Sequence, residues 1–389
     1  MKKLLLFLVL TGSAIFANAQ WQQTSCPSGN AIICLAVSGS NIFAGTNGNG
    51  VYLSIDNGTT WNPVNSGLTN TDVRALAVKG TDIYAGTYGN GMFVSANNGT
   101  SWTAVNTGLS IDNIVFISVI GGTIFVGTDN SGSLLFLSSD NGSSWSSVST
   151  GVNFFTSLTS SGSDIFAGTY GGTVSLSTNN GSNWSNASTG ITATIVRAIA
   201  ACGTNIIAGS DNGVFLSSNN GTTWNAIDST AFYISVAEFA VSDTNIFAGS
   251  YGGKVFLSSN CGATWADVST GIVSSNVRSL TIAATTIFAG TWDNGVWKRQ
   301  MSEFATAGID EININGHFTI YPNPATNNLT IESLQQATIE ITNIQGQTIL
   351  LQPIQQGKTD IDISGLAKGI YVLRLNSNGK TAVTRIVRE

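Results

Sequence analysis

The sequence predicts an all-β fold: a seven-bladed β-propeller closed by its own N-terminal strand and followed by a small β-sandwich. Three observations predict it. A short apolar–Gly motif recurs seven times within residues 20–300, regularly spaced tryptophans mark one strand per repeat, and only 9% of the 389 residues are charged. Few Lys and Glu residues leave few strong helix formers, while abundant Gly, Ser, Thr and Asn suit tight turns between strands.

The first 19 residues have the pattern of a signal peptide. Lys2 and Lys3 supply positive charge, residues 4–10 form an apolar core, and Ala17-Asn18-Ala19 resembles a small-residue cleavage site. The apolar run is too short for a membrane span, and no later segment is long enough, so we expect no transmembrane segment in the mature chain. We therefore expect export into an oxidising compartment.

The repeat has a period of 40 or 41 residues, which is typical of propeller blades with four short strands each. The marker glycines that end the apolar motif are Gly45, Gly86, Gly127, Gly168, Gly209, Gly249 and Gly290. Ten residues before each marker lies an apolar residue, which we expect to pack between neighbouring blades. In the second repeat we expect strands at 73–78, 83–87, 92–95 and 102–105, joined by turns that contain Gly.

The tryptophans predict how the ring closes. The first six repeats each end in an outer strand with a Trp, whereas the seventh ends at Val296-Trp297-Lys298-Arg299 and lacks an outer strand. The segment Trp21-Gln22-Gln23-Thr24, directly after the expected cleavage site, matches the missing strand. We therefore expect residues 20–300 to form one propeller whose last blade is completed by this segment, leaving no open sheet edge at the seam.

The turn before each outer strand carries the box Ser-x-Asp-x-Gly-x-x-Trp, or the same pattern with Asn. The Asp or Asn positions are Asp56, Asn97, Asp140, Asn179, Asn219 and Asn260. A short polar side chain here can accept hydrogen bonds from nearby backbone N–H groups, so we interpret the box as a structural turn. Four neutral copies argue against a calcium site, which favours carboxylates, and we expect no metal and no cofactor.

This box resembles the Asp-box (BNR) repeats of sialidase-like propellers, over most of residues 21–300. Sialidases of that kind use three arginines, a Tyr/Glu pair and an acidic residue, but residues 21–300 contain a single Glu, Glu238, and no His. The usual imidazole base is therefore missing from the repeats. We expect a binding protein rather than an enzyme. The alternative is a glycan-active hydrolase or lyase with Asp129, Asp211 or Glu238 as its acid or base.

Candidate ligand-binding residues fall at two positions of the repeat that share one face of the ring. They are Tyr88, Tyr170, Tyr251 and Trp292, two residues after a marker glycine, and Arg74, Arg197 and Arg278, twelve residues before one. Rings beside guanidinium groups suit a glycan, polymer or protein ligand. The alternative is a structural rim whose residues satisfy one another. The Gly80-Thr81 turn predicts that Arg74 faces Thr87 rather than Tyr88.

Net charge and cysteines exclude other functions. The formal charge is −6 and no basic patch is present, so nucleic acid is not an expected partner. The four cysteines lack the spacing of metal ligands. Cys26 and Cys34 are close enough in sequence to form a disulfide across one loop. Cys202 and Cys261 are interpreted as small core or turn residues.

After a polar linker at 301–315, residues 316–389 alternate as the short strands of a small Ig-like β-sandwich. The segments Tyr321-Pro322-Asn323-Pro324, Asn343-Ile344-Gln345-Gly346 and 366–371 closely resemble the C-terminal sorting domain of the Bacteroidetes type IX secretion system. The resemblance implies that the type IX machinery is a partner, and that the protein passes through the periplasm to the extracellular space or outer-membrane surface. The expected function is a secreted or surface-attached binding module.

Overall fold

The computed structural model describes residues 20–26, 31–110, 113–129, 134–148, 151, 154–227, 235–305, 318–333, 335–343, 347–377 and 380–388. The chain divides into two compact units, Met1–Met301 and Ser302–Glu389. The expected signal peptide at 1–19 and residues 306–315 of the expected linker lie outside the described residues. The described part is all-β apart from one short helix, α1 (Ser302–Ala305), and none of its helices could cross a membrane.

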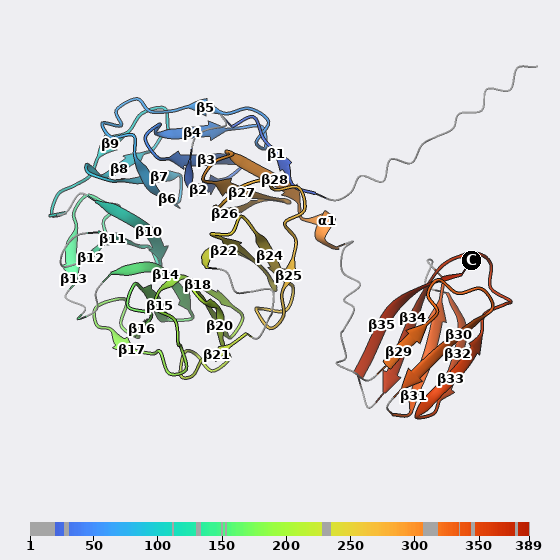
Figure 1. Ribbon diagram of the computed structural model, residues 1–389. Coiled ribbons are helices and arrows are strands. Elements are labelled where there is room, and N and C mark those ends of the chain that lie inside the picture. Colours follow the sequence, from blue (N-terminus) through green and yellow to red (C-terminus); the bar gives the residue numbers. More distant parts are fainter. Residues whose placement is uncertain are drawn as a thin grey trace, which may run out of the picture. The chain divides into compact units, whose positions relative to one another are not determined.

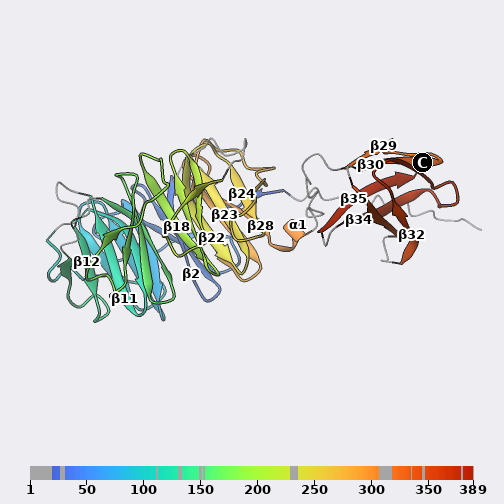
Figure 2. The same ribbon diagram turned by 90° about the horizontal axis from the view of Figure 1, so that it is seen from below.

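Antiparallel four-stranded sheets build the first unit and stand around a common axis in a propeller-like arrangement (Figure 1). Within each sheet the chain steps outward from the axis, except that the outermost strand of the last sheet comes from Gln22–Gln23. In the side view of Figure 2, strands of neighbouring sheets stand next to one another.

The strands of these sheets, given from the axis outward, have the following bounds. They are β2 (Ile32–Ser38), β3 (Asn41–Thr46), β4 (Val51–Ser54) and β5 (Asn62–Pro63); β6 (Val73–Lys79), β7 (Asp82–Thr87), β8 (Gly91–Ser95) and β9 (Thr103–Ala104); β10 (Ile114–Ile120), β11 (Thr123–Thr128), β12 (Leu135–Ser138) and β13 (Ser146–Val148); β14 (Phe155–Ser161), β15 (Asp164–Thr169), β16 (Val174–Ser177) and β17 (Ser185–Asn186); β18 (Val196–Cys202), β19 (Asn205–Ser210), β20 (Gly213–Ser217) and β21 (Asn225–Ala226); β22 (Val236–Ser242), β23 (Asn245–Ser250), β24 (Val255–Ser258) and β25 (Ala266–Asp267); and β26 (Val277–Ala283), β27 (Thr286–Thr291), β28 (Val296–Gln300) and β1 (Gln22–Gln23).

The marker glycines allow neighbouring sheets to approach each other. Gly86 lies in β7, and a Cβ atom at this position would be 2.3 Å from the side chain of Ile114 in the next sheet. Any larger residue would therefore push the sheets apart. The apolar column behaves as predicted, because Leu76 of β6 belongs to the same buried cluster as Phe43 of β3 in the preceding sheet.

The box turns are held by their own side chains. Oδ1 of Asp56 accepts hydrogen bonds from the Ser54 hydroxyl at 2.9 Å and from the Thr60 backbone N–H at 2.8 Å. Oδ1 of Asn97 accepts the equivalent bonds from Ser95 and Ser101, both at 2.9 Å. The neutral amide therefore does the same structural work as the carboxylate, which agrees with the interpretation of the box as a turn.

The N-terminal strand pairs with the last strand of the repeat region. In Figure 1, β1 (blue) lies beside β28 (orange), and Gln22 pairs with Lys298. Trp21 donates its indole N–H to the Val268 carbonyl at 2.8 Å and its backbone N–H to the Thr270 carbonyl at 2.9 Å. Trp102 makes the same two bonds to the sheet before it, accepted by the carbonyls of Val64 and Ser66. Trp21 thus has the contacts of Trp102, which Trp145 and Trp224 also make.

Each innermost strand contains a β-bulge close to its start. The pairing of β6 with β7 joins Val73 to Thr87 and Ala75 to Gly86, so Arg74 has no partner in the ladder. The predicted register, with Arg74 facing Thr87, is wrong for this reason. The residues skipped in this way are Ile33, Arg74, Val115, Thr156, Arg197, Ala237 and Arg278. A bulge turns its extra side chain out of the normal alternation, and all of these residues line one central cavity.

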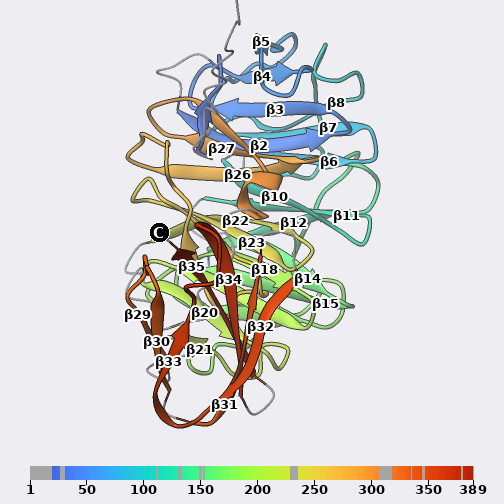
Figure 3. The same cartoon turned by 90° about the vertical axis from the view of Figure 1, so that its right-hand side faces the viewer.

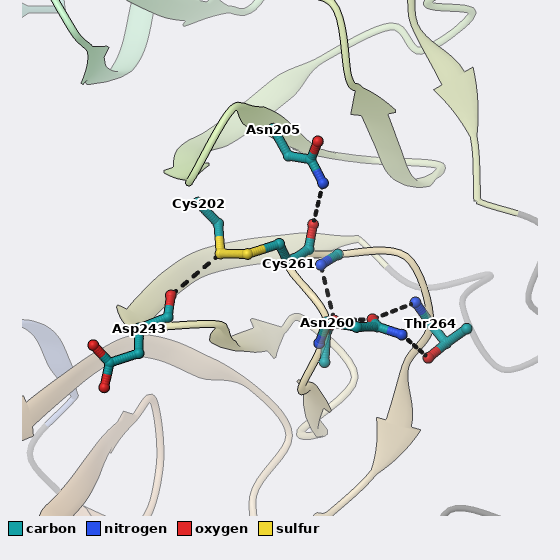
Figure 4. The surroundings of a disulfide bond; sticks show 8 residues. Cys202, Asn205, Asp243, Asn260, Cys261 and Thr264 are labelled. Carbon is teal, nitrogen blue, oxygen red and sulfur yellow. Dashed lines mark hydrogen bonds between the residues drawn. A yellow bond between two sulfur atoms is a disulfide. The ribbon is translucent and has the colours of Figure 1, made fainter. Parts of the chain in front are cut away.

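The disulfide prediction was also wrong. Cys202, at the end of β18, is bonded to Cys261, in the turn after β24, with 5.3 Å between their Cα atoms (Figure 4). Cys26 and Cys34 are free and buried. They pack into different apolar clusters, and the Cys34 thiol faces the Val73 carbonyl of the neighbouring sheet. Burial raises the pKa of Cys26 to about 12 and that of Cys34 still further, so both stay protonated thiols.

The second unit consists of two sheets that share one apolar core. One sheet has the order β29 (Phe318–Tyr321), β30 (Asn328–Ser333) and β33 (Gly357–Asp362); the other has the order β32 (Thr348–Ile354), β31 (Ala337–Thr342), β34 (Gly369–Ser377) and β35 (Lys380–Arg388). Figure 3 shows β30 beside β33. Leu329 and Ile361 of the first sheet are buried together with Ile339 and Leu373 of the second, as expected for a β-sandwich.

Candidate ligand-binding site

A cavity of about 610 Å³ lies among the innermost strands of the first unit. Its volume falls in the range of small-ligand sites. Eight of the residues singled out in the sequence line it, namely Arg74, Tyr88, Asp129, Tyr170, Arg197, Glu238, Tyr251 and Arg278. Trp292 and Asp211 are not part of its lining, although Trp292 contacts one of the arginines. The two positions of the repeat therefore converge as predicted from their spacing.

Five of the residues singled out in the sequence, Trp292 among them, form a continuous cation–π row across four sheets. The Arg197 Cζ atom lies 6.0 Å from the ring centroid of Tyr170 and 4.9 Å from that of Tyr251. The Arg278 Cζ atom lies 5.0 Å from the centroid of Tyr251 and 5.3 Å from that of Trp292. Stacking uses the faces of the guanidinium groups, so that their N–H edges stay available for other partners.

The third arginine of the rim is already neutralised. Arg74 pairs with Asp72, with Nε 2.7 Å from Oδ1 and a terminal nitrogen 2.8 Å from Oδ2. Its Cζ atom also lies 5.2 Å from the ring centroid of Tyr88, a contact that the predicted register left open. Asp72 was not among the residues singled out in the sequence. An acidic residue two positions before Arg74 could nevertheless have indicated an ion pair.

Arg197 and Arg278 differ from Arg74 in this respect. Within the described part of the chain, neither forms an ion pair. Arg197 donates from Nε to the Ser235 hydroxyl at 3.0 Å, which fixes its orientation. Ser235 is a second contact that sequence reasoning missed, because it precedes β22 in the neighbouring repeat. Both guanidinium groups are half-buried, where a charge interacts more strongly with an incoming anion than it would in open water.

Glu238 is the acidic group with the most perturbed environment in the cavity. Glu238 lines the cavity among the innermost strands and is exposed to solvent there. This enclosure raises the pKa of Glu238 to about 7, against the opposing attraction of Arg278. Glu238 is therefore close to half-ionised at neutral pH. Asp129 also lines the cavity and is exposed.

Asp211 has a structural role, contrary to its nomination as an acid or base. Its Oδ1 atom accepts hydrogen bonds from the backbone N–H groups of Thr194 and Ile195, both at 3.1 Å, and Oδ2 accepts the Thr194 hydroxyl. Partial burial works against ionisation, but these hydrogen bonds prevail and lower the pKa of Asp211. Its carboxylate thus holds the loop that leads into β18.

The cation–π row ends in exposed aromatic rings. Tyr170 is 53% exposed and Trp292 is 37% exposed, at the two ends of the row. Phe154, which the sequence reasoning missed, is 38% exposed and meets Tyr170 edge-on with 6.3 Å between ring centroids. It lies outside the two repeat positions used for the prediction. Flat apolar surface next to charged donors is typical of a ligand-binding surface.

Two family models match the chain. Residues 319–389 match the secretion system C-terminal sorting domain, and residues 8–120 match the DUF6242 β-propeller domain. This chain is a β-propeller with a type IX sorting tail. The tail implies contact with the secretion machinery and indicates a secreted or cell-surface protein. No curated protein matches the sequence.

Several solved structures share the fold. YCF48 from Cyanidioschyzon merolae has a TM-score of 0.59 at 15% identity, covering 73% of this chain and 99% of its own. A structure titled YCF48 bound to D1 peptide has a TM-score of 0.59 at 14% identity, with coverages of 74% and 97%. PorZ, an essential surface component of the type IX secretion system of Porphyromonas gingivalis, has a TM-score of 0.57 at 16% identity. That match covers 92% of this chain but 59% of PorZ.

Proposed function

We propose that the protein is a secreted or surface-attached binding module whose ligand is held by the cation–π row at the mouth of the central cavity. The observation that carries the proposal is the pair Arg197 and Arg278, which stack on exposed rings beside a 610 Å³ cavity and form no ion pair among the described residues. Such a site suits an anionic ligand: an acidic glycan, another polymer or a segment of a protein.

The proposed architecture has four parts: a signal peptide at 1–19, a seven-bladed propeller at 20–300, a linker at 301–315 and the sorting domain at 316–389. The equivalent hydrogen bonds of Trp21 and Trp102 support β1 as the strand that closes the ring. The shared bonding of the boxes supports their classification as Asp-box repeats of the sialidase-like kind.

The position of the protein outside the cell supports a role in binding extracellular material. The signal peptide would bring the chain to the periplasm, and the tail would then direct it through the type IX machinery. The similar structure titled YCF48 bound to D1 peptide supports a binding role here without identifying the ligand.

A glycan array probed with the purified protein tests the proposal. We expect binding to acidic glycans and its loss in an Arg197→Gln/Arg278→Gln variant with an unchanged thermal transition. Absence of binding to any glycan, together with absence of binding to proteins of the cell surface, would refute the binding role and favour a purely structural one.

A second candidate, a glycan-active hydrolase or lyase, is favoured by Glu238 alone. A carboxyl group with a pKa of about 7 inside a cavity is suited to donate and accept a proton near neutral pH. The discriminating experiment is a screen of glycosidase, sialidase and lyase substrates with the protein and with Glu238→Gln. Turnover that disappears in Glu238→Gln would establish the enzyme and displace the binding role.

A further inference from the structure

The cation–π row holds two guanidinium groups against the same ring. Arg197 and Arg278 lie in sheets on either side of the sheet that carries Tyr251, and both stack on this one ring. Since each Cζ atom is within 5.0 Å of the same ring centroid, the two cations are no more than about 10 Å apart. Two positive charges are thus held close together by their contacts with one neutral ring.

The free edges of these cations point to carboxylates as partners. A guanidinium group that stacks by its face still presents a planar fork of N–H donors, which matches the two oxygens of a carboxylate. Ser235 accepts a hydrogen bond only from Nε of Arg197. Among the described residues no other group forms a hydrogen bond with this arginine, so its terminal nitrogens are available to a ligand. Each of the two arginines has its own fork, so two carboxylates on one chain can each pair with one of them.

We propose that the row binds two carboxylates of one acidic polysaccharide strand, which lies across the sheets from Tyr170 to Trp292. This deepens the proposed function and rests on it. Once the first carboxylate is bound to Arg197, the second is held near Arg278 at a high effective concentration, so the strand binds far more tightly than a single sugar acid.

A glycan fits the row better than an extended peptide does. The row offers rings and guanidinium edges from side chains, whereas strand addition of a peptide depends on main-chain hydrogen bonds along a sheet edge. At its ends, Tyr170 and Trp292 expose broad ring surface, on which the apolar faces of pyranose rings can pack. Acidic peptides are therefore a competing ligand class for the experiment to exclude.

Arg74 provides a matched internal control. It has the same residue type at the same bulge position and lines the same cavity, but its fork is already occupied by Asp72. If charge near the cavity were all that mattered, Arg74 would contribute as much as the other two arginines. If free forks matter, replacing Arg74 should have little effect.

The experiment is a calorimetric titration of the purified protein with galacturonic acid and its di-, tri- and tetrasaccharides. Neutral galactose oligosaccharides and an oligoglutamate peptide serve as comparison ligands. We expect affinity to rise at least about 100-fold between the monosaccharide and the longest oligosaccharide. Arg197→Gln and Arg278→Gln should each remove this rise, while Arg74→Gln should retain it.

Several outcomes would overturn the inference. Equal affinity for all chain lengths, an unchanged rise in both Arg197→Gln and Arg278→Gln, or tighter binding of the peptide would each contradict two-point binding of a glycan while leaving an anion-binding site intact. Absence of binding to every anionic ligand would instead refute the proposed function itself. Thermal unfolding of each variant, expected to match that of the native protein, shows whether a loss of binding reflects the site or the fold.

Discussion

The guanidinium group of Arg197 stacks on the ring of Tyr251 in the neighbouring sheet, with its Cζ atom 4.9 Å from the ring centroid. Arg278 stacks on the same ring from the following sheet, at 5.0 Å. Tyr251 therefore orients both cations, although it carries no charge itself. Its loop lies between β23 and β24, so the geometry of the site depends on the correct packing of three consecutive sheets.

The first prediction concerns Tyr251 as a positioning residue. Tyr251→Ala should weaken binding of an acidic oligosaccharide by roughly tenfold or more, because both arginines lose a stacking partner and regain side-chain freedom. Tyr251→Phe keeps the ring and should bind almost as well as the native protein. Calorimetric titration measures both constants. Equal losses in the two variants would indicate that the hydroxyl group, not the stacking, is what matters.

The second prediction is a pH dependence set by Glu238. Below pH 7 the carboxyl is protonated and leaves Arg278 to the ligand; above pH 7 it is ionised, attracts Arg278 and repels ligand carboxylates. Binding should therefore be tighter at pH 6 than at pH 8. The other charged groups at the cavity are Arg197, Asp129 and the Arg74–Asp72 pair. The Glu238→Gln variant should bind the ligand equally well at both pH values. If the native protein also binds equally at pH 6 and pH 8, the pH dependence assigned to Glu238 is contradicted.

The same group affects folding stability with a defined sign. The pKa of Glu238 is about 7 in the folded protein, above its ordinary value of 4.5, so the folded state holds the proton more tightly than the unfolded state. Stability should therefore fall as pH rises from about 5 through 7. Thermal unfolding at pH 5 and pH 8 should show a smaller difference for Glu238→Gln than for the native protein.

The fourth prediction tests closure of the ring by Trp21. Trp21 is buried and makes the inter-sheet hydrogen bonds that Trp102 makes elsewhere. Trp21→Ala should lower the free energy of unfolding by about 3–5 kcal/mol, as should Trp102→Ala. Gln22→Ala, at an exposed position of β1, is the control and should have little effect. Native-like stability of Trp21→Ala in chemical denaturation would show that β1 does not hold the ring together.

The fifth prediction concerns the disulfide between β18 and the turn after β24. Cys202→Ala/Cys261→Ala should lower the free energy of unfolding by about 2–4 kcal/mol, because the bond closes a loop of 59 residues. Alkylation of the unfolded, unreduced protein should modify only Cys26 and Cys34. A peptide map that instead joins Cys26 to Cys34 would contradict the structure.

Much of the fold could be predicted from the sequence because each repeat carries its own turn signals. Gly80 and the box at Asn97 mark the ends of strands so clearly that the four strands of the second repeat were placed within about two residues. In the C-terminal unit, β32 and β33 carry weaker sequence signals than the other strands. Pro353 interrupts the first, and Gly357–Asp362 contains one apolar side chain, that of Ile361, so neither has the apolar alternation of a typical strand.

The site could be predicted only in part. Its two repeat positions identified the arginines and most of the rings, but the direction of Arg74 depended on a bulge that neither Gly nor Pro marks in the sequence. The Cys202–Cys261 bond depended on which turns meet between adjacent sheets. Aligning the repeats would have shown that Cys261 replaces the Asn that precedes the box Gly elsewhere, in a turn that reaches back to the preceding sheet.

A crystal structure of the protein soaked with trigalacturonate shows whether the ligand lies on the cation–π row. We expect one carboxylate within hydrogen-bond distance of Arg197 and a second within that distance of Arg278, with sugar rings against Tyr170 or Trp292. A trisaccharide bound at another surface, or one held at Arg74 with Arg197 and Arg278 untouched, would contradict this expectation.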